Sequence, residues 1–161
     1  RELIMSFLGS YSTHPIRKVI GDYLNSKEGC LSQNTGDWHF YKKGEELQNC
    51  AKTYIETIGN SKISLCPKGT GPSTIRLWES MAMGAVPMII SDSLQLPLEK
   101  SIEWDKHIIT VPEKESDNLD KYIPSNDRLK SMSKNCIETY KEYFSEDVMH
   151  KIIIGEINGQ V

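Results

Sequence analysis

The sequence predicts an α/β domain with a Rossmann-like, doubly wound parallel sheet. Short apolar runs of strand length alternate along the chain with longer stretches of helical periodicity, which is the pattern of βαβ units. The clearest such unit is a strand over 63–66, a Gly- and Pro-rich loop over 67–72, a helix over 73–83 and a strand over 86–90. Gly84 follows the helix directly, where C-caps favour glycine.

The other elements follow from the same two patterns. The apolar run over 3–8 predicts a buried first strand. Ser12 or Thr13 is expected to cap the next helix, with Pro15 in its first turn. The remaining elements, expected from apolar runs or helical spacing, are strands over 38–41 and 108–111 and helices over 45–57, 118–123 and 129–144.

Composition excludes several classes of protein. The chain has 161 residues, of which 38% are hydrophobic and 25% charged, and these values are typical of one globular domain. A net charge of -3 argues against a nucleic-acid surface. No apolar run is long enough to span a bilayer. The chain opens on Arg1 rather than Met, which suggests a piece of a longer protein.

The cysteines leave the compartment open. Cys30, Cys50, Cys66 and Cys136 are widely separated and form neither a Cys-x-x-Cys pair nor a zinc-finger spacing with a histidine. They are expected to be ordinary thiols, although an even number also permits disulfides in a secretory lumen. The cytoplasm and the Golgi lumen both remain possible locations.

Polar residues follow three of the expected strands, at 9–12, 68–73 and 91–92. In open α/β sheets, ligands bind outside the carboxyl ends of the strands. The middle segment is the most informative, because a Gly/Pro loop before a Ser-capped helix leaves backbone N–H groups free to bind an anion. Gly69 and Gly71 would let a phosphate approach the backbone closely.

The expected helix adds two charged side chains to this phosphate site. Arg76 lies in the first turn, where a cation opposes the helix dipole but becomes a charge-assisted donor beside a phosphate. Glu79 lies one turn later on the same face and is placed to accept hydrogen bonds from ribose hydroxyls. The alternative is an ordinary turn with a surface Arg76–Glu79 ion pair, worth roughly 0.3–0.5 kcal/mol. The loop is neither a P-loop nor a dinucleotide-binding fingerprint, because it lacks Gly-Lys-Ser/Thr and Gly-x-Gly-x-x-Gly.

Four ordered segments resemble the C-terminal signature of the exostosin family, inverting glycosyltransferases of the GT-B fold that mostly use UDP-sugars. The four segments are SKISLCPKG (61–69), PSTIRLWE (72–79), GAVPMIISD (84–92) and LPL (96–98). Near the start, Phe7-Leu8-Gly9 followed by Ile16-Arg17 is similar to the family's strand-Gly loop and Arg-bearing helix. The detailed match covers residues 61–104, with weaker support over 3–24.

The resemblance implies that residues 1–161 form a single nucleotide-sugar-binding domain, the C-terminal half of a GT-B pair. Glu79 would then hold the ribose, and Asp92 would face the sugar or the acceptor unless it only forms a turn. Arg17 would contact the diphosphate, or be an exposed helix arginine. The implied nucleotide and diphosphate set is Gly9, Arg17, Lys68, Gly69, Gly71, Ser73, Thr74, Arg76 and Glu79.

The same resemblance implies that an N-terminal domain, absent from this chain, binds the glycan acceptor and supplies the catalytic base. No base is therefore named within the chain. His14 lies near a strand end, but a lone loop histidine is more often a solvated surface residue. Trp38 and Tyr41 are candidates for lining the base pocket, or else core aromatics.

The expected reaction is an inverting transfer of a sugar from a UDP-sugar to a glycan, with no activity in the isolated chain. Helix N–H groups and Arg76, rather than a metal, would stabilise the UDP leaving group, because no Asp-x-Asp pair occurs in the sequence. No other cofactor is expected. Two alternatives stay open: a non-catalytic nucleotide-sugar-binding subunit, and a GT-B transferase that uses GDP-fucose.

Overall fold

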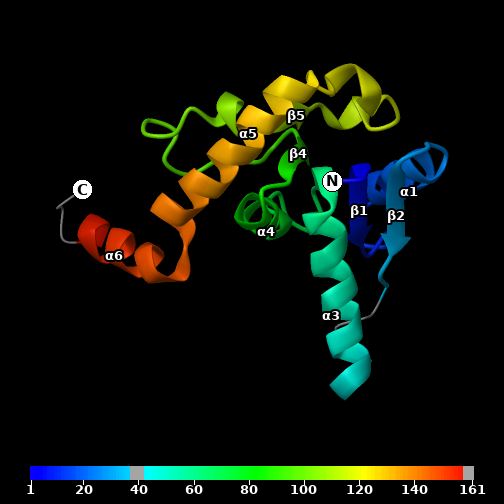
Figure 1. Ribbon diagram of the computed structural model, residues 1–161, viewed down its shortest axis with the longest axis horizontal. Coiled ribbons are helices and arrows are strands. Elements are labelled where there is room, and N and C mark those ends of the chain that lie inside the picture. Colours follow the sequence, from blue (N-terminus) through cyan, green and yellow to red (C-terminus); the bar gives the residue numbers. More distant parts are fainter. Residues whose placement is uncertain (37–41, 158–161) are drawn as a thin grey trace.

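A five-stranded parallel sheet forms the centre of the protein (Figure 1). The computed structural model describes residues 1–36 and 42–157. The strands are β1 (Leu3–Gly9), β2 (Cys30–Asn34), β3 (Ser61–Pro67), β4 (Val86–Ile90) and β5 (Ile109–Val111). They pair in the order β2-β1-β3-β4-β5, and all four pairings are parallel.

Helices cover both faces of the sheet, which confirms the predicted doubly wound α/β fold. The α-helices are α1 (Pro15–Asn25), α3 (Gly44–Gly59), α4 (Arg76–Met83), α5 (Asn126–Thr139) and α6 (Glu146–Ile157). The short elements are the 3-10 helices η1 (Trp104–Lys106), η2 (Glu113–Glu115) and η3 (Leu119–Tyr122) and the π-helix η4 (Tyr140–Phe144). Within the described ranges, no helix has the length and apolarity needed to cross a membrane.

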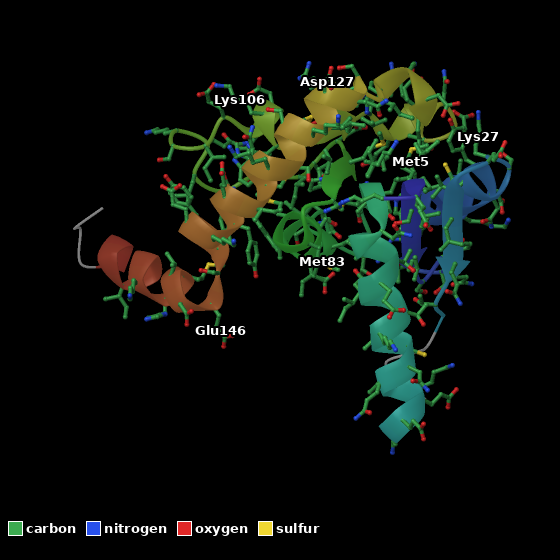
Figure 2. All side chains as sticks on the ribbon, viewed as in Figure 1. Met5, Lys27, Met83, Lys106, Asp127 and Glu146 are labelled. Carbon is green, nitrogen blue, oxygen red and sulfur yellow. The ribbon has the colours of Figure 1, made fainter. Side chains whose placement is uncertain are left out.

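The core consists of two clusters, one on each face of the sheet. In β4, Val86, Met88 and Ile90 belong to the cluster under α1 and the start of α5, while Ile89 belongs to the cluster with α4 and η4. This alternation shows a strand buried on both faces, as expected in a parallel sheet. Figure 2 shows side chains packed around the sheet. The α3 helix extends beyond the carboxyl ends of the strands (Figure 1).

The helix caps differ from those expected. His14, rather than Ser12 or Thr13, caps α1, because its Nδ1 atom accepts a hydrogen bond from the Ile16 N–H at 3.3 Å. Pro15 begins that helix, as predicted. The α4 helix begins at Arg76 rather than Ser73. Its N-cap residue is Ile75, which has helical dihedral angles, and no side chain of the described residues caps the helix. Gly84 forms the predicted C-cap with φ of 70°.

One strand and one α-helix of the described residues were not predicted. β2 is a polar edge strand with mostly exposed side chains, so its sequence shows little apolar alternation. The α6 helix was also missed. The helix expected over 129–144 is α5 followed by a π turn, and the helix expected over 118–123 is the 3-10 helix η3. The strand expected over 38–41 lies outside the described residues.

Candidate functional site

Arg17 lies across the point where the strand order reverses. In the order β2-β1-β3-β4-β5, this switch point lies between β1 and β3, and ligands of such sheets bind beside it. From α1, Arg17 donates through Nε to the Lys68 carbonyl at 2.8 Å and through Nη2 to the Pro67 carbonyl at 3.3 Å. Its Nη1 donates to the Ser10 carbonyl at 3.3 Å. The guanidinium therefore ties the loop after β1 to the loop after β3.

Arg76 is buried beside the end of β1, with only 8% of its surface exposed. Its Nη2 donates to the Leu8 carbonyl, and its guanidinium lies 4.8 Å from the centroid of the Phe7 ring and 5.7 Å from that of Tyr54. Its Nε is buried and has no hydrogen-bond partner among the described residues. The guanidinium of Arg17 lies 5.7 Å from the same Phe7 ring, so the two cations are neighbours.

Neither guanidinium has a counter-ion in the part of the chain that the structure describes: no carboxylate lies within 4.0 Å of either one. Burial, and then the charge of Arg76, lowers the pKa of Arg17 to about 10, so Arg17 remains cationic near neutral pH. Burying charge without a partner is costly. Two such cations at a switch point indicate a binding site for an anion.

Two glycines make room for these guanidiniums. A Cβ atom on Gly9 would lie 2.9 Å from Arg76 Nη2, and a Cβ atom on Gly69 would lie 2.8 Å from Arg17 Nη2. Gly71 faces open space within 4 Å, and its carbonyl accepts the Gly69 N–H at 3.2 Å. Of the three glycines predicted for the site, Gly9 and Gly69 are therefore the ones that leave room for the guanidiniums. The Gly69 N–H is hydrogen-bonded within its own loop.

We expect Gly69→Ala to weaken anion binding, because the new methyl group must displace the tip of Arg17. A charge-assisted hydrogen bond contributes about 1.5–3 kcal/mol to binding. Partial displacement of Arg17 should therefore lower the affinity for pyrophosphate roughly threefold or more. Gly71→Ala is the matched control, since no described atom lies within 4 Å of the new methyl group. Calorimetric titration of pyrophosphate into both variants measures the difference. Equal affinities for the two variants would contradict the placement of Arg17 at the anion site.

The predicted residues at the start of α4 lie at the same edge of the sheet. Ser73 is exposed and Thr74 is half-buried. The first bonds of the helix run from the Leu77 N–H to the Thr74 carbonyl at 3.3 Å and from the Trp78 N–H to the Ile75 carbonyl at 3.0 Å. The N–H groups that precede Leu77 therefore lie outside the helical ladder, as at any helix N-terminus.

Glu79 does not pair with Arg76. Its Oε2 accepts a hydrogen bond from the Tyr54 hydroxyl at 2.6 Å, across from α4 to α3. The surface ion pair considered as the alternative for these two residues is therefore absent, since Arg76 is buried and Glu79 contacts another helix.

A second polar cluster joins the ends of β3, β4 and β5. Lys68 Nζ pairs with Glu113 Oε1 at 2.9 Å. The Asp92 N–H donates to Glu113 Oε1 at 3.0 Å, and the Glu113 N–H donates to Asp92 Oδ1 at 3.1 Å. The bond from Asp92, and then the one from Lys68, lower the pKa of Glu113. Asp92 thus ties the end of β4 to the start of η2, and its second carboxylate oxygen takes no part in this reciprocal pair.

Glu113 was missed by sequence reasoning, although a signal was available. It follows the strand over 109–111, whose carboxyl end lies at the same edge of the sheet as the three strand ends named in the sequence analysis.

Among the described side chains, no group of three or more His, Cys, Asp or Glu residues is arranged to hold a metal ion.

His14 is unsuited to act as a general base while it caps α1. Its Nδ1 lone pair accepts the Ile16 N–H, so in the neutral ring the proton is on Nε2. No ring nitrogen is then free to take a proton from an acceptor. The other aromatic candidates, Trp38 and Tyr41, lie outside the described residues.

Comparisons with known proteins show the family to which the chain belongs. The family described as the Exostosin GT47 domain matches residues 1–125. Two proteins of Arabidopsis thaliana, each named as a "Probable glucuronoxylan glucuronosyltransferase", match most of the chain. One is 40% identical over 125 residues, which cover 76% of this chain and 26% of the relative. The other is 30% identical over 121 residues, which cover 74% of this chain and 26% of the relative.

An animal relative matches along the whole chain. The "Exostosin-1 homolog" of Caenorhabditis elegans is 28% identical over 182 aligned positions, which cover 100% of this chain and 47% of the relative. The chain thus spans about a quarter of the two plant proteins and about half of the nematode protein. Because the family match covers most of the chain and includes every strand of the sheet, the chain belongs to the exostosin GT47 family.

Proposed function

We propose that this chain is the donor-binding domain of an inverting glycosyltransferase and holds the diphosphate of a UDP-sugar between Arg17 and Arg76. The observation that carries the proposal is the pair of neighbouring guanidiniums, one buried and one half-buried, without a carboxylate partner among the described residues. A diphosphate supplies the missing negative charge and accepts hydrogen bonds from both side chains. Membership of the exostosin GT47 family supports the choice of a sugar nucleotide.

In the proposed reaction, a base outside this chain removes a proton from an acceptor hydroxyl, and the hydroxyl oxygen attacks the anomeric carbon of the donor. The bond between that carbon and the β-phosphate oxygen breaks, and the configuration inverts. Negative charge then develops on the UDP leaving group, where Arg17, Arg76 and the N–H groups at the start of α4 stabilise it. This function for the two arginines makes a bridging metal unnecessary.

The remaining residues of the site are assigned by their positions. Glu79, one turn beyond Arg76 on α4, recognises the ribose. Asp92, together with Lys68 and Glu113, lies at the ends of β3 to β5 and is assigned to the donor sugar or the acceptor. The acceptor glycan and the base belong to an N-terminal domain of the longer protein, so we propose that the chain alone binds donor without turnover.

The names of the relatives suggest which donor to examine first. Both plant relatives are named as glucuronoxylan glucuronosyltransferases. UDP-glucuronic acid is therefore the first sugar nucleotide to compare with UDP.

The proposal is tested by titrating the chain with UDP in a calorimeter, first in EDTA and then in excess Mn²⁺. We expect saturable binding with nearly the same affinity in both buffers, because Arg17 and Arg76 neutralise the diphosphate without a metal. GDP serves as the nucleotide control and should bind more weakly. Absence of UDP binding would refute the proposed function, and a large gain on adding Mn²⁺ would refute the metal-free mechanism.

A further inference from the structure

The structure assigns Tyr54 as a positioning residue for Glu79, which orients that carboxylate toward the ribose of the bound nucleotide. This inference rests on the proposed function, since it names how the same site recognises the nucleoside part of its ligand. The two residues come from different helices: Tyr54 from α3 and Glu79 from α4. These helices lie side by side on one face of the sheet (Figure 1).

The contact between them is direct. The Tyr54 hydroxyl donates to Glu79 Oε2 at 2.6 Å, and both side chains are half-buried. The Tyr54 ring also lies 5.7 Å from the guanidinium of Arg76, which precedes Glu79 by one turn of α4. Burial raises the pKa of the Tyr54 phenol, so the hydroxyl keeps its proton and remains a donor. Tyr54 thus touches both charged residues of α4 that the proposed site uses.

The hydrogen bond fixes one oxygen of Glu79 and leaves the other available. Oε1 of Glu79 has no side-chain partner in the described part of the chain. A carboxylate anchored through one oxygen presents the lone pairs of the other in a defined direction, which suits a ribose hydroxyl as donor. A free glutamate on a helix surface would instead lose rotamer freedom on binding. Tyr54 therefore contributes by fixing the carboxylate before the nucleotide arrives.

A purely structural role for Tyr54, as packing between α3 and α4, makes a different prediction. Loss of packing would disturb Arg76 and Glu79 together, and every ligand of the site would bind less well. Loss of the hydroxyl alone removes the orientation of Glu79 and leaves the ring beside Arg76. The contrast between UDP, which has a ribose, and pyrophosphate, which has none, separates the two roles.

The experiment measures UDP and pyrophosphate affinity for the wild-type chain, Tyr54→Phe, Glu79→Gln and the double variant. We expect Tyr54→Phe to weaken UDP binding about 3- to 10-fold, the scale of one hydrogen bond, and to leave pyrophosphate binding unchanged. In the Glu79→Gln background, Tyr54→Phe should have almost no further effect, because the two residues act as one unit. Tyr23→Phe is the matched control. The Tyr23 hydroxyl oxygen accepts the Asp120 N–H at 3.1 Å, and Tyr23 lies at the end of α1 opposite to Arg17.

The outcomes distinguish this inference from the proposal it rests on. If Glu79→Gln weakens UDP selectively while Tyr54→Phe does not, the positioning role of Tyr54 is wrong and the ribose role of Glu79 stands. Equal losses of UDP and pyrophosphate in Tyr54→Phe would show a structural role only. If the wild-type chain binds neither ligand, the proposed function itself fails, and the inference fails with it.

Discussion

Arg76→Met is expected to weaken UDP binding by about 1.5–3 kcal/mol, roughly 10- to 150-fold, without lowering the stability of the ligand-free chain. The loss of affinity follows from removing a charge-assisted donor to the diphosphate. Stability should be kept because an apolar side chain beside Phe7 and Tyr54 replaces a buried cation that has no carboxylate partner among the described residues, and this offsets the lost hydrogen bond to the Leu8 carbonyl. Apolar replacement of a buried charge is often neutral or stabilising.

Calorimetry and thermal unfolding of the same samples check both parts of this expectation. UDP should raise the unfolding temperature of the wild-type chain and have little effect on Arg76→Met. Arg128→Met, an exposed change on α5, serves as the control for losing one arginine charge. Unchanged UDP affinity in Arg76→Met would remove Arg76 from the site. A lower unfolding temperature without ligand would show that Arg76 mainly holds the fold.

Arg17→Met is expected to reduce both UDP affinity and stability, in contrast to Arg76→Met. The UDP loss should again be about 1.5–3 kcal/mol, because one cation of the pair is lost. The stability loss should be about 1–2 kcal/mol, since the carbonyls of Ser10, Pro67 and Lys68 lose their donors. For a chain of this size that corresponds to about 2–8 °C in unfolding temperature.

The neighbouring residue Lys18 provides the control for Arg17. It lies on the same helix, and its one ion pair among the described residues is with Asp22, at 2.6 Å, on the exposed surface. Lys18→Met should therefore leave both UDP affinity and the unfolding temperature nearly unchanged. If Arg17→Met lowered the unfolding temperature and kept full UDP affinity, Arg17 would be a structural clamp between the two loops and no part of a diphosphate site.

The sequence was sufficient to predict the fold class, and it named the residues of the candidate site. The strands over 3–8, 63–66 and 86–90 were correctly placed, because in a parallel sheet they are continuous apolar runs. Arg17 and Arg76 could both be named from the sequence as diphosphate candidates, and the structure brings them beside the same Phe7 ring. Their assignment to a diphosphate stays a prediction until binding is measured.

Other features depend on contacts that a linear pattern does not contain. The burial of Arg76 could not be predicted, because it results from packing of α4 against β1 and α3. The bond between Tyr54 and Glu79 joins two helices that are separate in the sequence. His14 replaced Ser12 and Thr13 as the cap because an imidazole nitrogen can accept an N–H as a hydroxyl does. β2 was missed because an edge strand needs few apolar residues.

If the proposed diphosphate site is correct, the two guanidiniums, which have no carboxylate partner among the described residues, would also link the amount of folded protein to the supply of its ligand. An anion that binds only the folded state stabilises it by about 2.7 kcal/mol when its concentration is 100 times the dissociation constant. Repulsion between Arg17 and Arg76 opposes folding, and a bound diphosphate would relieve it. In a cell whose proteases remove unfolded chains, a population of this protein would therefore rise and fall with the pool of its sugar nucleotide, before any transfer reaction takes place.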